Sequence, residues 1–168
     1  MDLNSFFPSL YASEIGLTVV LTRLLFAAIM GGILGFDREM LSRPAGMRTH
    51  MLVSLAAATF TVVTFELIEQ AKAEGSTSVD PIRIIEAVTA GVAFLAAGAI
   101  IQSRGKIHGV TTGAGLWLAG AVGTACGIGA YAIAIIATGL GFVVLTLVRY
   151  TTDAIPKEAE PPAKKADD

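Results

Sequence analysis

The strongest constraint in this sequence is a run of 42 residues, 107–148, that contains no Asp, Glu, Lys or Arg. A helix needs about 20 apolar residues to cross the roughly 30 Å hydrocarbon core of a bilayer, so this run has room for two spans and a tight turn. Hydrophobic residues make up 54% of the whole chain, whereas ordinary soluble domains contain roughly 45 to 50%. The sequence therefore predicts an integral membrane protein with one domain.

Five apolar segments emerge along the chain, with approximate limits 15–36, 47–65, 84–103, 110–125 and 130–148. All six prolines lie outside these segments, as expected for helices, because proline disrupts a helix interior. A transmembrane β-barrel would need segments of about 10 residues that alternate in polarity, and these segments are apolar throughout. The predicted fold class is all-α: a polytopic transmembrane helical bundle of about five spans within residues 1–150.

The distribution of Lys and Arg predicts the orientation, because short cytoplasmic connections carry an excess of positive charge. Three arginines follow the first segment, Arg104 and Lys106 follow the third, and four basic residues follow the fifth. The connection after the second segment is mainly acidic. This pattern predicts an N-terminus outside and a C-terminus in the cytoplasm. Residues 151–168 are polar and contain three prolines, which predicts a disordered cytoplasmic tail.

Glycine is frequent inside the predicted spans, often at the GxxxG spacing that lets transmembrane helices approach closely. We interpret these positions as helix-packing seams. They include Gly31 with Gly35, Gly109 with Gly113, and Gly123 with Gly127.

Two charged residues fall inside predicted spans. Arg23 interrupts the first and Glu86 lies at the outer start of the third, so their depths in the membrane nearly match. A charged side chain in hydrocarbon costs about 2.5 kcal/mol or more, which favours a buried Arg23–Glu86 ion pair. Two alternatives are that Arg23 extends to the outer headgroups, or that it belongs to a site that handles ions or protons.

A charge cluster is predicted at the cytoplasmic end of the first two spans, with Asp37, Arg38, Glu39, Arg48 and His50 as its members. One interpretation is a set of interfacial salt bridges. The other is a Mg²⁺ site, in which oxygens of Asp37 and Glu39 would hold the ion through retained water. Residues two apart do not share a helix face, which weighs against joint binding. His50 is predicted to be a polar packing or hydrogen-bonding residue.

Thr111 and Thr112 open the fourth predicted span. Hydroxyl groups at a helix start either cap that helix or bond across to a neighbouring helix. A helix start of this kind can also hold an anion.

Enzyme signatures are missing from the sequence: there is no GxxxxGK[ST], HExxH or G-x-S-x-G motif and no pair of cysteines. Two histidines and the single Cys126 are too few ligands for a buried transition metal. The net charge of −2 argues against nucleic acid as the main partner. We therefore predict a non-enzymatic protein without a cofactor other than, in the alternative above, Mg²⁺. Its expected partners are lipid and other membrane proteins or a second copy of the chain.

Residues 35–39, GFDRE, and 44–53, PAGMRTHMLV, closely resemble the signature of the MgtC/SapB family of bacterial membrane proteins. Segments 80–83, 91–100 and 109–112, the last together with Leu116 and Trp117, are similar to later blocks of the family, in the same order. Asp37 stands where the family usually has Glu, and Ala93 and Ala96 replace expected glycines.

The resemblance implies an inner-membrane protein of about five spans, with its N-terminus outside. It also implies the short SapB-like branch of the family, without a soluble C-terminal domain. The leading functional expectation is an accessory or regulatory protein in magnesium homeostasis and stress adaptation. The alternative is a small transporter or channel for Mg²⁺ or another ion, which would use Arg23, Glu86 and the interfacial carboxylates.

Overall fold

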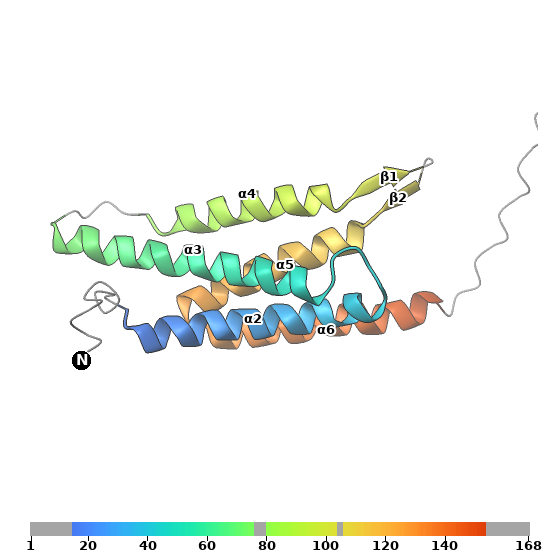
Figure 1. Cartoon of the computed structure of the whole chain (residues 1–168), viewed down its shortest axis with the longest axis horizontal. Helices are drawn as coiled ribbons and strands as arrows, with labels where there is room; N and C mark the ends of the chain where they lie inside the picture. Colours follow the sequence, from blue (N-terminus) through green and yellow to red (C-terminus); the bar gives the residue numbers. More distant parts are fainter. Residues whose placement is uncertain (1–14, 76–79, 104–105, 154–168) are drawn as a thin grey trace, which may run out of the picture.

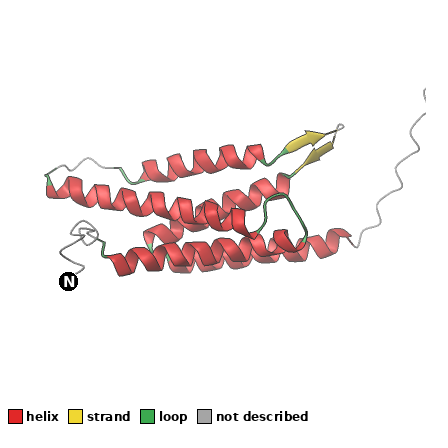
Figure 2. Ribbon diagram, in the orientation of Figure 1, coloured by secondary structure: helices red, strands yellow, loops and turns green. Residues whose placement is uncertain are grey.

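The computed structural model describes residues 15–75, 80–103 and 106–153, and it confirms a helical bundle (Figures 1 and 2). In chain order the elements are α2 (Leu17–Met40), α3 (Met47–Ala73), α4 (Ile82–Gly98), β1 (Ile101–Ser103), β2 (Lys106–His108), α5 (Val110–Ile128) and α6 (Tyr131–Asp153). Residues 151–153, predicted to belong to a disordered tail, continue α6. The rest of that predicted tail lies outside the described residues.

Successive helices run in opposite directions along the bundle (Figure 1). The turn 41–46, the hairpin and the end of α6 lie at one end, which we call the basic end because Arg38, Arg43 and Arg48 are there. The start of α2, the end of α3, the start of α4 and the α5–α6 turn lie at the opposite end. The connections predicted to be cytoplasmic therefore share one end of the bundle, while the side of the membrane that this end faces stays a prediction.

Two helices, α2 and α3, are each long and apolar enough to cross a membrane by length and composition. Helix α3 continues to Ala73, eight residues beyond the predicted span. The predicted span ended where charged residues begin, but charged residues mark the edge of the hydrocarbon and a helix can continue past them. The added turns contain an ion pair between Lys72 Nζ and Glu69 Oε1 at 2.7 Å. The count of five spans remains a prediction.

The third predicted span, 84–103, was wrong at its C-terminal end. Helix α4 stops at Gly98, and β1 pairs antiparallel with β2, so that Ile101 lies opposite His108. The apolar character of residues 99–101 suggested a continuing helix, but β-branched isoleucines also suit a strand. The hairpin satisfies backbone groups at the basic end, where the chain turns back into α5.

Helix α5 is the centre of the bundle and packs against each of the other four helices. Eleven of its 19 residues are buried. A side chain at Gly123 would overlap the backbone of Ser54 in α3, and a Cβ at Gly127 would lie 2.8 Å from the carbonyl oxygen of Ala58. These helices are therefore in contact at the level of their backbones.

Helices α2 and α3 approach each other in the same way. A Cβ at Gly31 would lie 2.6 Å from the carbonyl oxygen of His50, and one at Gly35 would lie 2.6 Å from Cα of Met47. In α5, a Cβ at Gly113 would lie 2.9 Å from the carbonyl oxygen of Ala96 in α4.

Not every predicted packing glycine has this role. Gly109 precedes α5, has φ of +87° and lies against the carbonyl group of Ala99, so it forms a turn and not part of a helix seam. Three other glycines inside predicted spans, Gly91, Gly98 and Gly139, face open space, because a Cβ there would meet no heavy atom within 4 Å apart from the neighbouring backbone of its own helix.

The α3–α5 contact predicts a difference between two glycine substitutions. Gly123→Ala should lower the free energy of unfolding by about 1–3 kcal/mol, because the added methyl group forces the two helices apart. Gly139→Ala is the matched control and should be neutral or stabilising by up to about 1 kcal/mol, because alanine favours a helix interior and space is open there. Thermal unfolding of the purified variants, followed by circular dichroism, measures both. Equal midpoints would contradict the close α3–α5 packing.

Candidate functional site

The turn at residues 41–46 brings the end of α2 against the start of α3. Ser42 adopts a left-handed conformation with φ of 51°. Its amide donates to the carbonyl oxygen of Glu39 at 3.0 Å, and the amide of Arg43 donates to the carbonyl oxygen of Arg38 at 3.0 Å. These two bonds form a Schellman motif, which ends the helix and reverses the chain.

Glu39 caps the first turn of α3. Its Oε2 accepts a hydrogen bond from the amide of Met47 at 3.0 Å, and Gly46 leaves room for the carboxylate. A negative charge is favourable there, because the amides at a helix N-terminus carry partial positive charge. The role of Glu39 in the structure is therefore to join α2 to α3.

The other members of the predicted charge cluster separate into two groups. Asp37 and Arg38 are buried, with 8% and 7% of their surfaces exposed, and Arg48 is exposed. Asp37 and Glu39 therefore have different surroundings, as expected for positions two residues apart on a helix. Among the residues whose side chains are described, no three His, Cys, Asp or Glu groups lie close enough to hold a metal ion.

His50 is fully buried where α2, α3 and α5 meet. Its Nδ1 lies 2.9 Å from the carbonyl oxygen of Gly46, and because a carbonyl group only accepts, Nδ1 must carry the proton. Nε2 is then an acceptor. It faces Gly115 of α5, where a Cβ would lie only 2.9 Å away. Gly115 thus provides the space that the ring of His50 requires.

At the opposite end, Arg23 binds the C-terminus of α5. Its Nη1 donates to the carbonyl oxygen of Gly127 at 2.8 Å. Helix α5 ends there in a second Schellman motif, in which Gly129 has φ of 90°. The guanidinium group therefore satisfies a carbonyl that has no partner within the helix, and it lies at the negative end of the helix dipole.

The predicted ion pair between Arg23 and Glu86 does not form in the structure, where Glu86 is an exposed residue of α4. Matching depths along the bundle did not determine how each helix is rotated about its axis. The end of α5 offers Arg23 a nearer electronegative partner.

The predicted capping of α5 by threonine is also wrong. The residue before the helix is Gly109, and no side chain caps this end. Thr112 is buried with 3% exposure, whereas Thr111 is exposed.

Two polar contacts were not predicted from the sequence. The hydroxyl group of Ser54 donates to the carbonyl oxygen of Ala27 at 2.8 Å, which links α3 to α2. Oε1 of Glu66 accepts from the amide of Ile15 at 3.2 Å, just before α2 begins. A lone serine in an apolar segment was the available signal for the first contact.

Residues 24–154 match the model of the MgtC family. The chain belongs to the MgtC family. The matched region contains the buried residues Asp37 and Arg38, the turn 41–46 and His50. It begins one residue after Arg23. No solved structure matches the chain significantly.

Relatives in the MgtC family come from several bacteria. Protein SrpB of Synechococcus elongatus is 37% identical over 137 residues, which cover 74% of this chain and 71% of SrpB. The putative magnesium transporter YhiD of Escherichia coli K12 is 34% identical over 130 residues, or 77% of this chain and 60% of YhiD. Protein MgtC of Brucella abortus is 37% identical over 123 residues, or 73% of this chain and 48% of that protein. The chain thus spans about half of MgtC and less than two thirds of YhiD.

For this MgtC family member, the structure predicts that Arg23 and Glu86 act independently. Arg23→Met should destabilise the protein by about 1–3 kcal/mol, because the buried carbonyl group of Gly127 loses its partner. Glu86→Gln should change stability by less than about 0.5 kcal/mol, as is usual at exposed positions.

The charge-swapped double variant, Arg23→Glu with Glu86→Arg, should be no more stable than Arg23→Glu alone. Thermal unfolding of the four variants tests this expectation. Recovery of the wild-type midpoint in the double variant would instead demonstrate an ion pair.

Proposed function

We propose that this protein is a non-enzymatic accessory or regulatory membrane protein in adaptation to low Mg²⁺ or a related stress. It would act at the inner membrane through contacts between its helices and other membrane proteins. The observation that carries this proposal is the close packing of α2, α3 and α5, which fills the middle of the bundle with backbone and small side chains.

Backbone contacts close the centre at several levels, at Gly31 near the carbonyl of His50, at Gly123 near Ser54, and at Gly127 near Ala58. Polar side chains there bond to nearby backbone groups. Thr61 donates to the carbonyl oxygen of Ala57 at 2.8 Å, and Ser54 donates across to α2. A centre of this kind supports a role for the outer surface of the bundle.

The surface of α4 is suited to helix contacts. Only Ile84 and Val92 of its 17 residues are buried within the chain. Gly91 and Gly98 are open to the surroundings, and small residues on an exposed transmembrane face let another helix approach closely. This face is where we place contacts with partner proteins.

Membership of the MgtC family supports the connection with magnesium. Because the relative YhiD is named a putative magnesium transporter, an ion transporter is the second candidate function. The buried charges of Asp37 and Arg38 favour this alternative, because charged groups inside membrane proteins often mark ion pathways.

Mg²⁺ flux into proteoliposomes, measured beside growth of a gene-deletion strain in low Mg²⁺, separates the two functions. We expect the wild-type protein to restore growth and to give the same flux as empty liposomes. Glu86→Gln should also restore growth, because its side chain is exposed and makes no contact that the fold requires. Wild-type flux that Asp37→Asn or Glu86→Gln abolishes would contradict the accessory role and establish transport.

A further inference from the structure

The second ring nitrogen of His50 is a buried polar atom that the fold leaves without a bond. Nδ1 holds its proton against the carbonyl oxygen of Gly46, so the ring is neutral while Nε2 carries no proton. Within residues 15–75, 80–103 and 106–153, no group forms a hydrogen bond with Nε2, although this atom is shielded from solvent. Buried polar atoms in native structures normally have a partner, so this exception requires an explanation.

We propose that His50 is a pH-sensitive switch between α3 and α5. While Nε2 is unprotonated, the start of α5 packs against the ring and the bundle is closed at its basic end. When Nε2 takes up a proton, the start of α5 moves away from α3. This proposal depends on neither the accessory role nor the transport role of the protein.

The position of Gly115 prevents any partner from reaching Nε2. A Cβ on Gly115 would lie 2.9 Å from Nε2 and 3.9 Å from each of the two ring carbons bonded to it, Cδ2 and Cε1. Equal distances to these carbons place that point on the line along which Nε2 would hold a proton. A water oxygen bonded to Nε2 would need the same position, at about 2.7–3.2 Å, and the backbone of Gly115 already fills it. A proton on Nε2 would therefore point at a C–H group, which accepts no hydrogen bond.

Charges on α2 add to the cost of a protonated ring. Arg38 is buried at the same end of the bundle, and its positive charge acts on the ring of His50. Of the two carboxylates nearby in the sequence, Glu39 caps α3, and Asp37 forms no hydrogen bond with Nε2. A buried charge is costly unless it is paired and hydrogen-bonded. In the closed bundle the protonated ring would be a cation with one unsatisfied donor.

Movement of α5 relieves this cost, because it lets water reach Nε2. Helix α5 offers no counter-charge of its own: it contains no Asp, Glu, Lys, Arg or His, and Cys126 lies near its opposite end. Imidazole is the side-chain group that ordinarily changes charge between about pH 5 and 8. The closed arrangement is therefore favoured at the upper end of this range, and the open arrangement gains as the pH falls.

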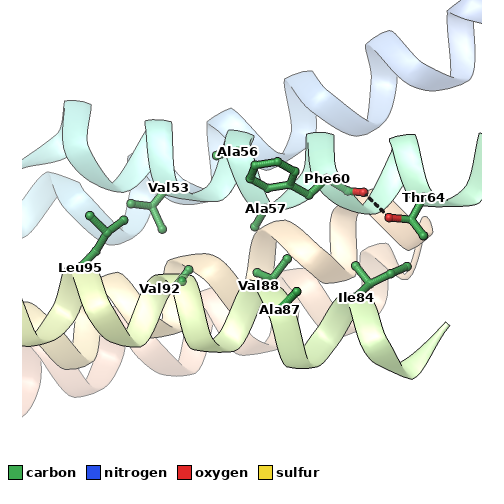
Figure 3. A pocket seen from close by; sticks show the side chains of 11 residues that line it. Val53, Ala56, Ala57, Phe60, Thr64, Ile84, Ala87, Val88, Val92 and Leu95 are labelled. Atoms are coloured by element: carbon green, nitrogen blue, oxygen red, sulfur yellow. Dashed lines mark hydrogen bonds between the residues drawn. The ribbon is translucent and has the colours of Figure 1, made fainter. Parts of the chain in front are cut away.

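The groove between α3 and α4 contains no group that competes for this proton. Its lining, drawn in Figure 3, consists of apolar side chains and Thr64, and none of them titrates. The hydroxyl group of Thr64 donates to the carbonyl oxygen of Phe60 in its own helix at 2.8 Å. A response to pH between α3 and its neighbours therefore points to His50.

A distance measurement by pulsed electron paramagnetic resonance tests the switch in the full-length protein. Spin labels on Leu52→Cys in α3 and Val110→Cys in α5, both exposed positions, report the separation of the two helices at the basic end. The background carries Cys126→Ala, and the protein is labelled at pH 8, reconstituted in liposomes and measured at pH 8 and pH 5. We expect a longer distance at pH 5, with its population raised at least about tenfold.

Three further variants separate His50 from other groups. His50→Asn keeps a donor near the position of Nδ1 but takes up no proton, so its distance should not depend on pH. His108→Asn removes the other histidine of the chain, which is exposed on β2, and should respond like the wild type. Gly115→Ala places a methyl group where Nε2 points and should lengthen the distance already at pH 8. Circular dichroism verifies the helical content of each variant, and His50→Gln is a second replacement that takes up no proton.

An unchanged distance between pH 8 and pH 5 in the labelled wild type would overturn the proposal. A pH response that persists without His50, or that disappears with His108→Asn, would also overturn it and assign the response to another group. A wild-type distance in Gly115→Ala at pH 8 would show that α5 does not rest on the ring, with the same consequence. None of these measurements involves Mg²⁺ flux or growth, so failure of the switch is distinguishable from failure of the proposed function.

Discussion

The backbone contact between Gly123 of α5 and Ser54 of α3 is the interaction on which the rest of the bundle depends. Lipid tails are as apolar as leucine, so burial of apolar surface gives transmembrane helices little reason to associate. Close approach is therefore the main source of stability, because dispersion attraction falls steeply with distance. Glycine permits that approach, and it places α5 at the centre of the bundle in contact with every other helix.

The central position of α5 explains the placement of the unusual polar residues. Arg23 binds the carbonyl end of α5, and His50 lies against Gly115 near the start of the same helix. Both side chains accordingly join α5 to its neighbours, one near each end of the bundle. Helix α4 packs mainly on the outer side of α5, which leaves a groove beside α3 and an exposed small-residue surface. The interior is thus specialised for stability, while most of α4 stays exposed on the surface of the chain.

Much of this fold was predictable because the constraints act locally along the chain. The long uncharged run predicted two helices with a turn, and the structure has that turn between Ile128 and Tyr131. The contacts of Arg23 were not predictable, because sequence gives the depth of a residue in a span but not the rotation of the helix about its axis. The hairpin was missed because strands of three residues carry too weak a pattern to distinguish from an apolar helix end. The capping of α3 by Glu39 was not predictable either. It depends on the path of the turn 41–46, and the sequence indicated a turn there without specifying its geometry.

The single Cys126 provides the most direct test of a closed interior, because its side chain is fully buried in α5 beside the contacts with α3. A small charged methanethiosulfonate reagent, added to native membranes from either side, measures whether water reaches this thiol. The account predicts modification at least about 100-fold slower than that of a free thiol, with full modification after denaturation. Rapid modification of the folded protein would reveal a water-filled pathway through the bundle and would contradict the account.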